Sequence, residues 1–373
     1  TSVTDTFVLS AALAVSGSAY ASLSLSVALT FADNTYDGTV RAKIDDSTID
    51  VEGDLSVLAT SSANIEVDGI GVSVSTSASA GGSIAGAAGA AVTSNTVTSI
   101  VEAAITNADT ASGQSVTADN VTVDATESLT VDADALAASV AVAAGIGGGS
   151  LSISAALAEN TSKSTVRAVI SNSKVTAETG SVLVDADTKT TLTTKPTAVS
   201  VAVTAAIGIA AAGAGAVARN TSASTVTAKI DEDSTVTADG ALAVRATDTS
   251  DAHAELLSLA ISGGLLGLSI GVGIAQNDIH NAVLASVLDS SAIAGGANDL
   301  SIIASATQDV EAKADVVSIS ISLGGAGAGA VTRTNLDSNV EAYARNANLT
   351  ASGNKVVIDA HSTHTARANS LGT

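Results

Sequence analysis

The fold of this chain is decided by a segment at residues 213–230, GAGAVARNTSASTVTAKI. The segment ends in Val226-Thr-Ala-Lys-Ile230, in which apolar residues alternate with Thr and Lys. Successive side chains of a β-strand point to opposite faces, so the alternation predicts a strand with one apolar face and one polar face. Asn220, at the centre, is expected to form a corner, because Asn tolerates left-handed backbone or can stack its amide on that of the next corner.

The same segment recurs about every sixty residues. The central Asn returns at Asn34, Asn95, Asn160, Asn220, Asn277 and Asn335. A related strand follows each of them, as in Val40-Arg-Ala-Lys-Ile44 and Val166-Arg-Ala-Val-Ile170. A fixed period of this length is typical of repeat architectures. It divides one continuous repeat array, 1–373, into approximate units 1–34, 35–95, 96–160, 161–220, 221–277, 278–335 and 336–373.

The rest of the unit predicts more strands. A short strand, 234–238, precedes a third strand, Leu242-Ala-Val-Arg-Ala246, and two nearly uncharged strands separated by Gly follow at 252–262 and 265–275. Five short strands without helical periodicity predict an all-β fold. A repetitive parallel β-solenoid (β-helix) is the first choice, with roughly 20 to 30 residues per coil and two or three coils per unit. An array of small β-sandwich modules is the alternative, although sandwich cores usually need aromatic residues.

Runs of Gly and Ala occupy the last strand of the unit, for example at residues 208–217. Gly weakens an isolated strand, so its recurrence suggests positions where backbones approach closely. Gly213 and Gly215 are therefore expected to be structural, and Val at either position is expected to impair assembly.

Composition limits what this chain can be. It has no Cys, Met or Trp, one Pro, two Phe and three Tyr, and its net charge is −22. Such a chain can build only a thin core of Ala, Val, Ile and Leu. The acidic charge disfavours nucleic acid as a partner. The uncharged stretch 197–218 is long enough for a membrane helix, but its period of two argues against one, so the chain is not expected to span a membrane. The two ends fall at nearly the same phase of the repeat without a cap, which indicates a fragment of a longer array or a subunit that stacks end to end.

Acidic pairs provide the only candidate metal ligands. Asp45 and Asp46, and likewise Asp231 and Asp233, could bind calcium through carboxylate oxygens, although no segment matches an EF-hand loop. The four His residues are scattered, and no Cys accompanies them. No catalytic or cofactor-binding residues are expected, and the chain is not expected to be an enzyme.

Three segments carry a resemblance to known proteins: the run Gly213 to Thr221, the Val-x-Ala-x-Ile strand after it, and Ala241 to Thr247. They resemble repeat regions of large bacterial surface proteins, namely leukotoxin-like filamentous adhesins and, more loosely, filamentous-haemagglutinin-type β-helical proteins. The resemblance implies secretion, an extracellular or cell-surface location and no chemistry. The expected function is a structural subunit or segment of a secreted bacterial filament or surface fibre. The alternative is an adhesin stalk or passenger that binds a cell-surface receptor or a glycan.

Overall fold

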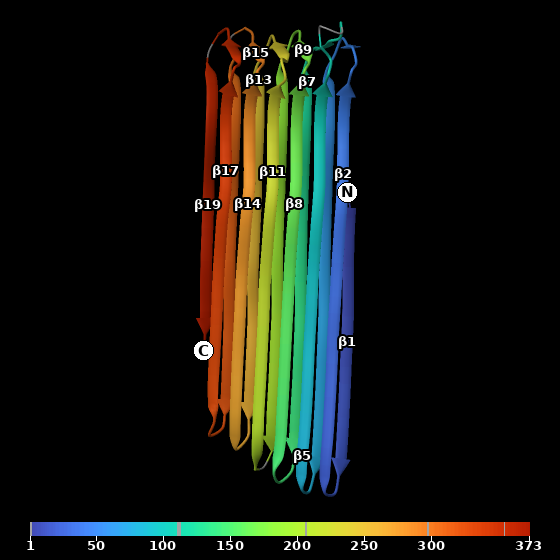
Figure 1. Cartoon of the computed structure of the whole chain (residues 1–373), viewed down its shortest axis with the longest axis vertical. Helices are drawn as coiled ribbons and strands as arrows, with labels where there is room; N and C mark the ends of the chain where they lie inside the picture. The colour runs from blue at the N-terminus through green and yellow to red at the C-terminus, as the bar shows by residue number, and fades with distance from the viewer. Residues whose placement is uncertain (1, 110–112, 206, 297, 354) are drawn as a thin grey trace.

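The structure, a computed structural model, describes residues 2–109, 113–205, 207–296, 298–353 and 355–373. Over these residues the chain is all-β. Its strands form three sheets, and every strand pairs in parallel with its counterparts in the neighbouring repeats (Figure 1). The predicted parallel β-solenoid is confirmed, and the alternative of separate β-sandwich modules is wrong. No helix long and apolar enough to cross a membrane occurs in the part of the chain that the structure describes.

Two sheets contain long strands and the third contains short ones. Sheet A consists of β1 (Ser2–Ser18), β4 (Leu55–Ser79), β7 (Val121–Ala144), β10 (Val182–Ala205), β13 (Leu242–Gly263), β16 (Leu300–Ile321) and β19 (Val356–Gly372). Sheet B consists of β2 (Ala21–Asp45), β5 (Gly82–Thr106), β8 (Gly148–Ser171), β11 (Gly208–Asp231), β14 (Leu266–Leu288) and β17 (Gly325–Arg345). Sheet C consists of β3 (Ile49–Asp50), β6 (Val116–Ala118), β9 (Lys174–Ala177), β12 (Thr235–Ala238), β15 (Ser291–Ala294) and β18 (Asn348–Ala351).

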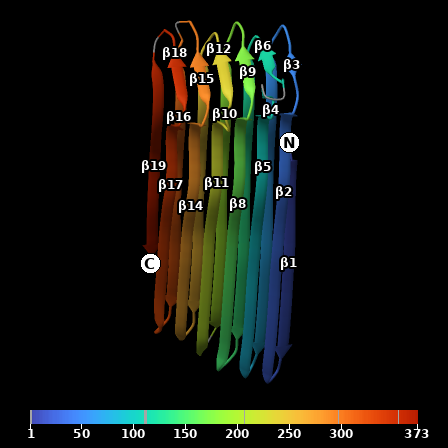
Figure 2. The same ribbon diagram turned by 45° about the horizontal axis from the view of Figure 1, so that its top comes forward.

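One coil runs down a strand of sheet A, turns, runs up a strand of sheet B and returns through a short strand of sheet C. The row of sheet C strands lies at the top of the molecule (Figure 2). The strands, and not the direction in which coils stack, follow the longest axis (Figure 1). The molecule is therefore a plate of stacked hairpin-like coils, closed along its upper border by sheet C.

Each coil contains about sixty residues, because Ser2 pairs with Ala63 and Val182 pairs with Leu242. The prediction of two or three coils per unit is therefore wrong. The five expected strands merge into three, since the segments at 242–246 and 252–262 both belong to β13. Inward and outward side chains continue to alternate through the Gly and Asn positions, so these residues do not interrupt the strands.

The core between sheets A and B changes composition with height. Near sheet C it contains branched side chains such as Ile105, Ile170 and Ile230. Near the turns that join sheet A to sheet B it contains mostly Ala, Ser and Gly. The hydroxyls of Ser139 in sheet A and Ser152 in sheet B lie 2.7 Å apart, which shows how closely the two sheets approach there. A row of buried Asn residues, Asn34, Asn95, Asn160, Asn220 and Asn277, crosses sheet B at mid-height. The upper half of the molecule lies between this row and sheet C, and the lower half lies between the row and the turns that join sheet A to sheet B.

The expected close backbone approach at Gly213 and Gly215 is wrong. Both residues face outward from β11, and a Cβ atom at either would meet no atom within 4 Å. The backbones approach closely at inward-facing glycines instead. A Cβ at Gly71 would lie 2.4 Å from the carbonyl oxygen of Ala90, and one at Gly89 would lie 2.6 Å from that of Ala138. The alternation of a strand decides which glycines meet the facing sheet.

Candidate functional site

A ladder of buried amides crosses the middle of the core. Asn34, Asn95, Asn160, Asn220 and Asn277 lie inside consecutive strands of sheet B, in register. Along the row Asn95, Asn160 and Asn220 each donate from Nδ2 to Oδ1 of the next Asn, at 3.0, 3.2 and 3.0 Å. The predicted stacking of amides is confirmed for these residues. The predicted corner is wrong, because the Asn residues lie within strands.

The ladder also joins the two long sheets. Asn160 donates from Nδ2 to the backbone carbonyls of Val131 and Thr193 in sheet A, at 3.1 and 2.7 Å. Asn220 donates in the same way from Nδ2 to the backbone carbonyl of His253, at 2.9 Å. A buried amide without partners is costly, so these bonds fix the height at which sheet B packs on sheet A.

Asn335 does not belong to this row. Thr334 pairs with Asn277, and its hydroxyl donates to the carbonyl oxygen of Arg367 at 3.1 Å. Asn335 is one residue further along and therefore points to the opposite face of β17. The prediction that Asn335 continues the Asn row is wrong, because Thr334, one residue earlier, occupies that position.

The corners of the coil lie about twelve residues after the ladder, where sheet B gives way to sheet C. Their left-handed residues are Asp46, Asn107, Asn172, Glu232, Asp233, Asp289 and Asn346, with φ between 46° and 58°. Asn and Asp adopt this conformation more readily than most residues. An Asn or Asp at the second position after the Val-x-Ala-x-Ile strand, replaced by Glu232-Asp233 in one coil, is the sequence signal that identifies these corners. The corner was expected at the wrong Asn.

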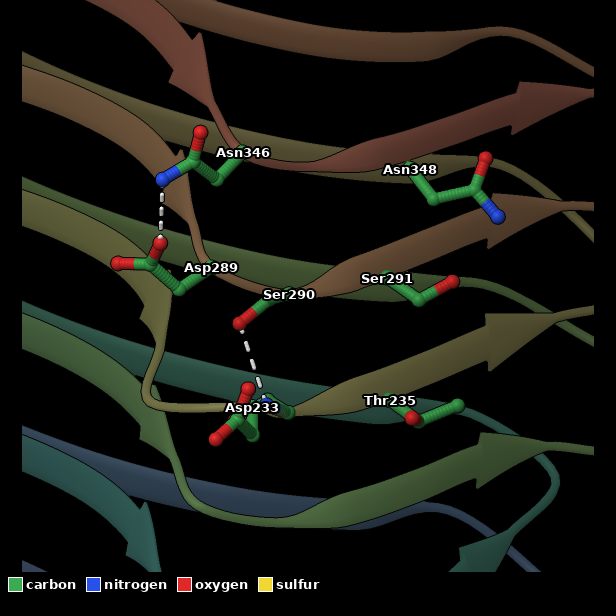
Figure 3. A pocket seen from close by; sticks show the side chains of 8 residues that line it. Asp233, Thr235, Asp289, Ser290, Ser291, Asn346 and Asn348 are labelled. Atoms are coloured by element: carbon green, nitrogen blue, oxygen red, sulfur yellow. Dashed lines mark hydrogen bonds between the residues drawn. The ribbon is translucent and has the colours of Figure 1, made fainter.

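A shallow pocket lies over three of these corners (Figure 3). Its lining residues are Asp233, Ser234, Thr235, Asp289, Ser290, Ser291, Asn346 and Asn348. Asn346 donates from Nδ2 to Oδ1 of Asp289 at 3.0 Å, and the backbone N–H of Ser234 donates to the Ser290 hydroxyl at 3.1 Å. These polar groups connect successive coils, so the pocket is a seam of the stack that holds its corners in place.

The four predicted calcium ligands lie at equivalent corners of two different coils. Asp45 accepts hydrogen bonds from Thr106 and Asn107, at 2.6 and 3.0 Å, and these bonds lower its pKa. Asp46 accepts a hydrogen bond from Gln114 at 2.8 Å.

Asp231 forms an ion pair with Lys229, and Asp233 lines the corner pocket. Within the described ranges no group of three or more His, Asp and Glu side chains is arranged to hold a metal ion. The carboxylates of the first pair thus accept hydrogen bonds from the adjacent coil.

The outer face of sheet A carries partly buried carboxylates. Asp185 lies between Asp124 and Arg245 in one row across neighbouring strands. Burial, followed by repulsion from Asp124, raises its pKa to about 6, against the attraction of Arg245. Burial and the charge of Asp124 also raise the pKa of Asp187 on the same strand. Folding therefore makes these acidic groups harder to ionise.

The histidines on β19 and the two Asn-x-Ser/Thr patterns inside the ladder give no further site. His361 and His364 lie three residues apart on β19, so their side chains point to opposite faces of the strand. His361 contacts Asp359 at 3.1 Å and is exposed. The Asn-x-Ser/Thr patterns at Asn160 and Asn220 are fully buried in the ladder, so their amides are inaccessible to a glycan transferase.

The lower half of the molecule has an apolar outer surface. Its strands are built from segments without a charged residue, at 6–32, 69–101, 135–158, 196–218, 256–277 and 316–332. The usual pattern is reversed on β8, where Ser150 and Ser152 are buried while Leu151 and Ile153 are each 49% exposed. At the A-to-B turns, Tyr20 is 87% exposed. Such a large apolar surface normally marks an interaction site.

Sheet B shows an alternation of large and small side chains across its strands. Two rows run across β2, β5, β8, β11, β14 and β17. The first contains Leu25, Gly86, Leu151, Ala211, Leu268 and Gly325, and the second contains Val27, Ala88, Ile153, Gly213, Ile270 and Gly327. The large residues of β2, β8 and β14 form ridges, and the small residues of the other three strands form grooves. On sheet A the corresponding outward positions of the interior strands are almost all branched, as at Val74, Val140 and Val201.

The comparisons with known proteins give no match: none was found among protein-family models, curated proteins or solved structures.

Proposed function

We propose that this chain is a non-enzymatic structural segment of a secreted bacterial fibre at the cell surface. The observation that supports it best is the stacking of coils. In all three sheets each strand pairs in parallel with the equivalent strand of the next coil. Every coil presents the same strand edges along the stacking direction, so one array can extend another by the pairing that joins its own coils.

The dimensions favour cohesion over reach. Neighbouring coils lie ~4.8 Å apart, so about sixty residues add less than 5 Å to the length of the stack. The strands of 24 residues in sheet A, such as β10, are about 80 Å long and set the width of the plate. A fibre of this design is wide and stiff for its length, and its stiffness comes from long parallel ladders and the amide row.

Electron microscopy and fibre diffraction of the purified chain test this proposal. We expect ribbons about 80 Å wide, with the ~4.8 Å strand spacing along the ribbon axis. Immunogold labelling of intact source cells should place the chain on surface fibres without permeabilisation.

Two results would contradict the proposal. Labelling seen only inside permeabilised cells would exclude a surface fibre. Discrete particles that bind cells saturably, through a receptor or a glycan, would support the adhesin stalk or passenger instead.

A further inference from the structure

The corrugated apolar face of sheet B is suited to a second copy of itself. We propose that two copies pack through this face, with their strands pointing in the same direction and their coils stacked in opposite order. Such a pair has a two-fold axis parallel to the strands, between β8 and β11. The pairing is lateral, so it goes beyond the proposed fibre role and does not depend on where the chain acts.

The size of the face is sufficient. Six strands at ~4.8 Å and nine residues at ~3.3 Å, from Leu23 to Phe31 on β2, cover about 900 Å² per copy. A stable interface needs about 800 Å² from each partner. Apolar sheets also pack face to face in proteins, at ~10 Å.

The shape of the face selects the orientation. In the proposed pair β2 of one copy faces β17 of the other, β5 faces β14, and β8 faces β11. In the second row Val27 then faces Gly327, and Ile153 faces Gly213. A two-fold axis along the stacking direction would place each strand on its own counterpart, with ridge against ridge. The row through Leu29 keeps large residues only on β2 and β14, because Ala155 on β8 is small. The rows through Leu23 and Phe31, at the ends of the apolar region, lack the alternation.

The charges at the upper border of this face point to the same orientation. One row across sheet B contains Asp33 on β2, Glu159 on β8, Arg219 on β11 and Arg333 on β17, and its other two members are neutral. The two acidic residues lie on one side of the proposed axis and the two basic residues on the other. The rotation therefore places Asp33 opposite Arg333 and Glu159 opposite Arg219.

Higher on the face the agreement is good but incomplete. Arg41 faces Glu341 and Asp45 faces Arg345, whereas Asp37 faces Asp337. Together with Asp33 and Arg333, these make four charged pairs between β2 and β17, of which three are attractive and one is repulsive. Complementary charges of this kind set orientation and partner choice.

Cross-linking tests the geometry directly, because the chain has no Cys. Two single variants are needed, Val27→Cys on β2 and Gly327→Cys on β17, with a short bis-maleimide linker. We expect cross-linked dimers when the two variants are mixed and almost none when either is alone. A Cβ at Gly327 meets no atom within 4 Å, so the substitution is compatible with the fold.

Charge reversal gives an independent test. Asp33→Arg should weaken self-association at least tenfold in sedimentation equilibrium, and adding Arg333→Asp should restore it. The two residues lie five strands apart, about 24 Å, so rescue requires contact between copies. Asp5→Arg, on the outer face of sheet A, is the matched control and should have no effect. Far-UV circular dichroism confirms that each variant is folded.

Three results would overturn the proposal. The first is a chain that stays monomeric at tens of micromolar. The second is cross-linking of either single variant with itself, which would show the other two-fold axis. The third is a monomer that floats with phosphatidylcholine vesicles, which would show that lipid covers this face.

Discussion

Asparagine and aspartate do two different things in this solenoid, depending on where the repeat places them. In the ladder, Asn side chains are buried in extended strands and bond to one another and to sheet A. At the corners, Asn and Asp adopt a left-handed backbone and bond to the next coil, as Asn172 does to Asn107 at 3.1 Å. The same residue type thus fixes the distance between sheets in one row and the end of a strand in the other.

We expect Asn160→Ala to destabilise the fold by about 2 to 3 kcal/mol, because it removes two hydrogen bonds to sheet A carbonyls, the donor to Asn220 Oδ1 and one of the acceptors of Asn95. Asn335→Ala is the matched control and should change stability by less than ~0.5 kcal/mol, since Asn335 lies outside the ladder. Urea unfolding of both variants measures the difference. Equal losses would show that the ladder adds nothing specific.

The raised pKa of Asp185 predicts a dependence of stability on pH. The unfolded carboxyl ionises near its ordinary value of 3.8, and the folded one at about 6. Between these values the folded state binds a proton that the unfolded state lacks, so stability falls as pH rises from 4 to 6 and stays lower above it.

Asp185→Asn should therefore raise the melting temperature at pH 7 and flatten its decrease between pH 4 and 6. Asp50→Asn, an exposed substitution in β3, is the control. A variant that keeps the full decrease would exclude Asp185 as its source.

At the level of elements, one physical property governs both the core and the surface: strict alternation along strands of more than twenty residues. In the lower half it places Ser, Ala and Gly inside and branched side chains outside. The small inward residues let the sheets approach, so Gly is required only where the facing backbone is near. The outward residues then form the corrugated face of sheet B.

Replacement of Gly by Ala at two positions of sheet B should therefore change the stability of the fold by different amounts. Gly89→Ala should destabilise the fold by about 1 to 3 kcal/mol, because the new Cβ would lie 2.6 Å from the Ala138 carbonyl oxygen. Gly213→Ala should be neutral or slightly stabilising in a monomer, since its Cβ enters open space. Thermal unfolding at low concentration compares them, and a larger loss for Gly213→Ala would contradict the assigned faces.

At the level of the whole molecule, the plate combines a net charge of −22 with an apolar lower half. The charged residues lie in the upper half, at the corners and within a few residues below the buried Asn row, where like charges lie close together. Repulsion of this kind destabilises a compact state and is reduced by salt.

We expect the melting temperature to rise by several degrees when NaCl is increased from ~20 to ~300 mM, which shortens the Debye length to below ~10 Å. Calcium should add no more than Mg²⁺ at equal ionic strength, because Asp45 and Asp46 already accept hydrogen bonds from the next coil. Differential scanning calorimetry with and without a chelator checks both statements. A melting temperature that rises more with calcium than with Mg²⁺ would show that the chain has a specific calcium site.

The all-β class, the period of about sixty residues and the solenoid could be predicted from the residues alone, because alternation and repetition are local properties that a chain shows before it folds. The sequence also indicated stacked amides at Asn160 and Asn220. The number of residues in a coil, the Asn that forms the corner and the Gly that meets a backbone could not be predicted in this way. These depend on where a strand ends and which face it turns to the other sheet, and a shift of one residue, as at Thr334 and Asn335, reverses the face without changing the local pattern.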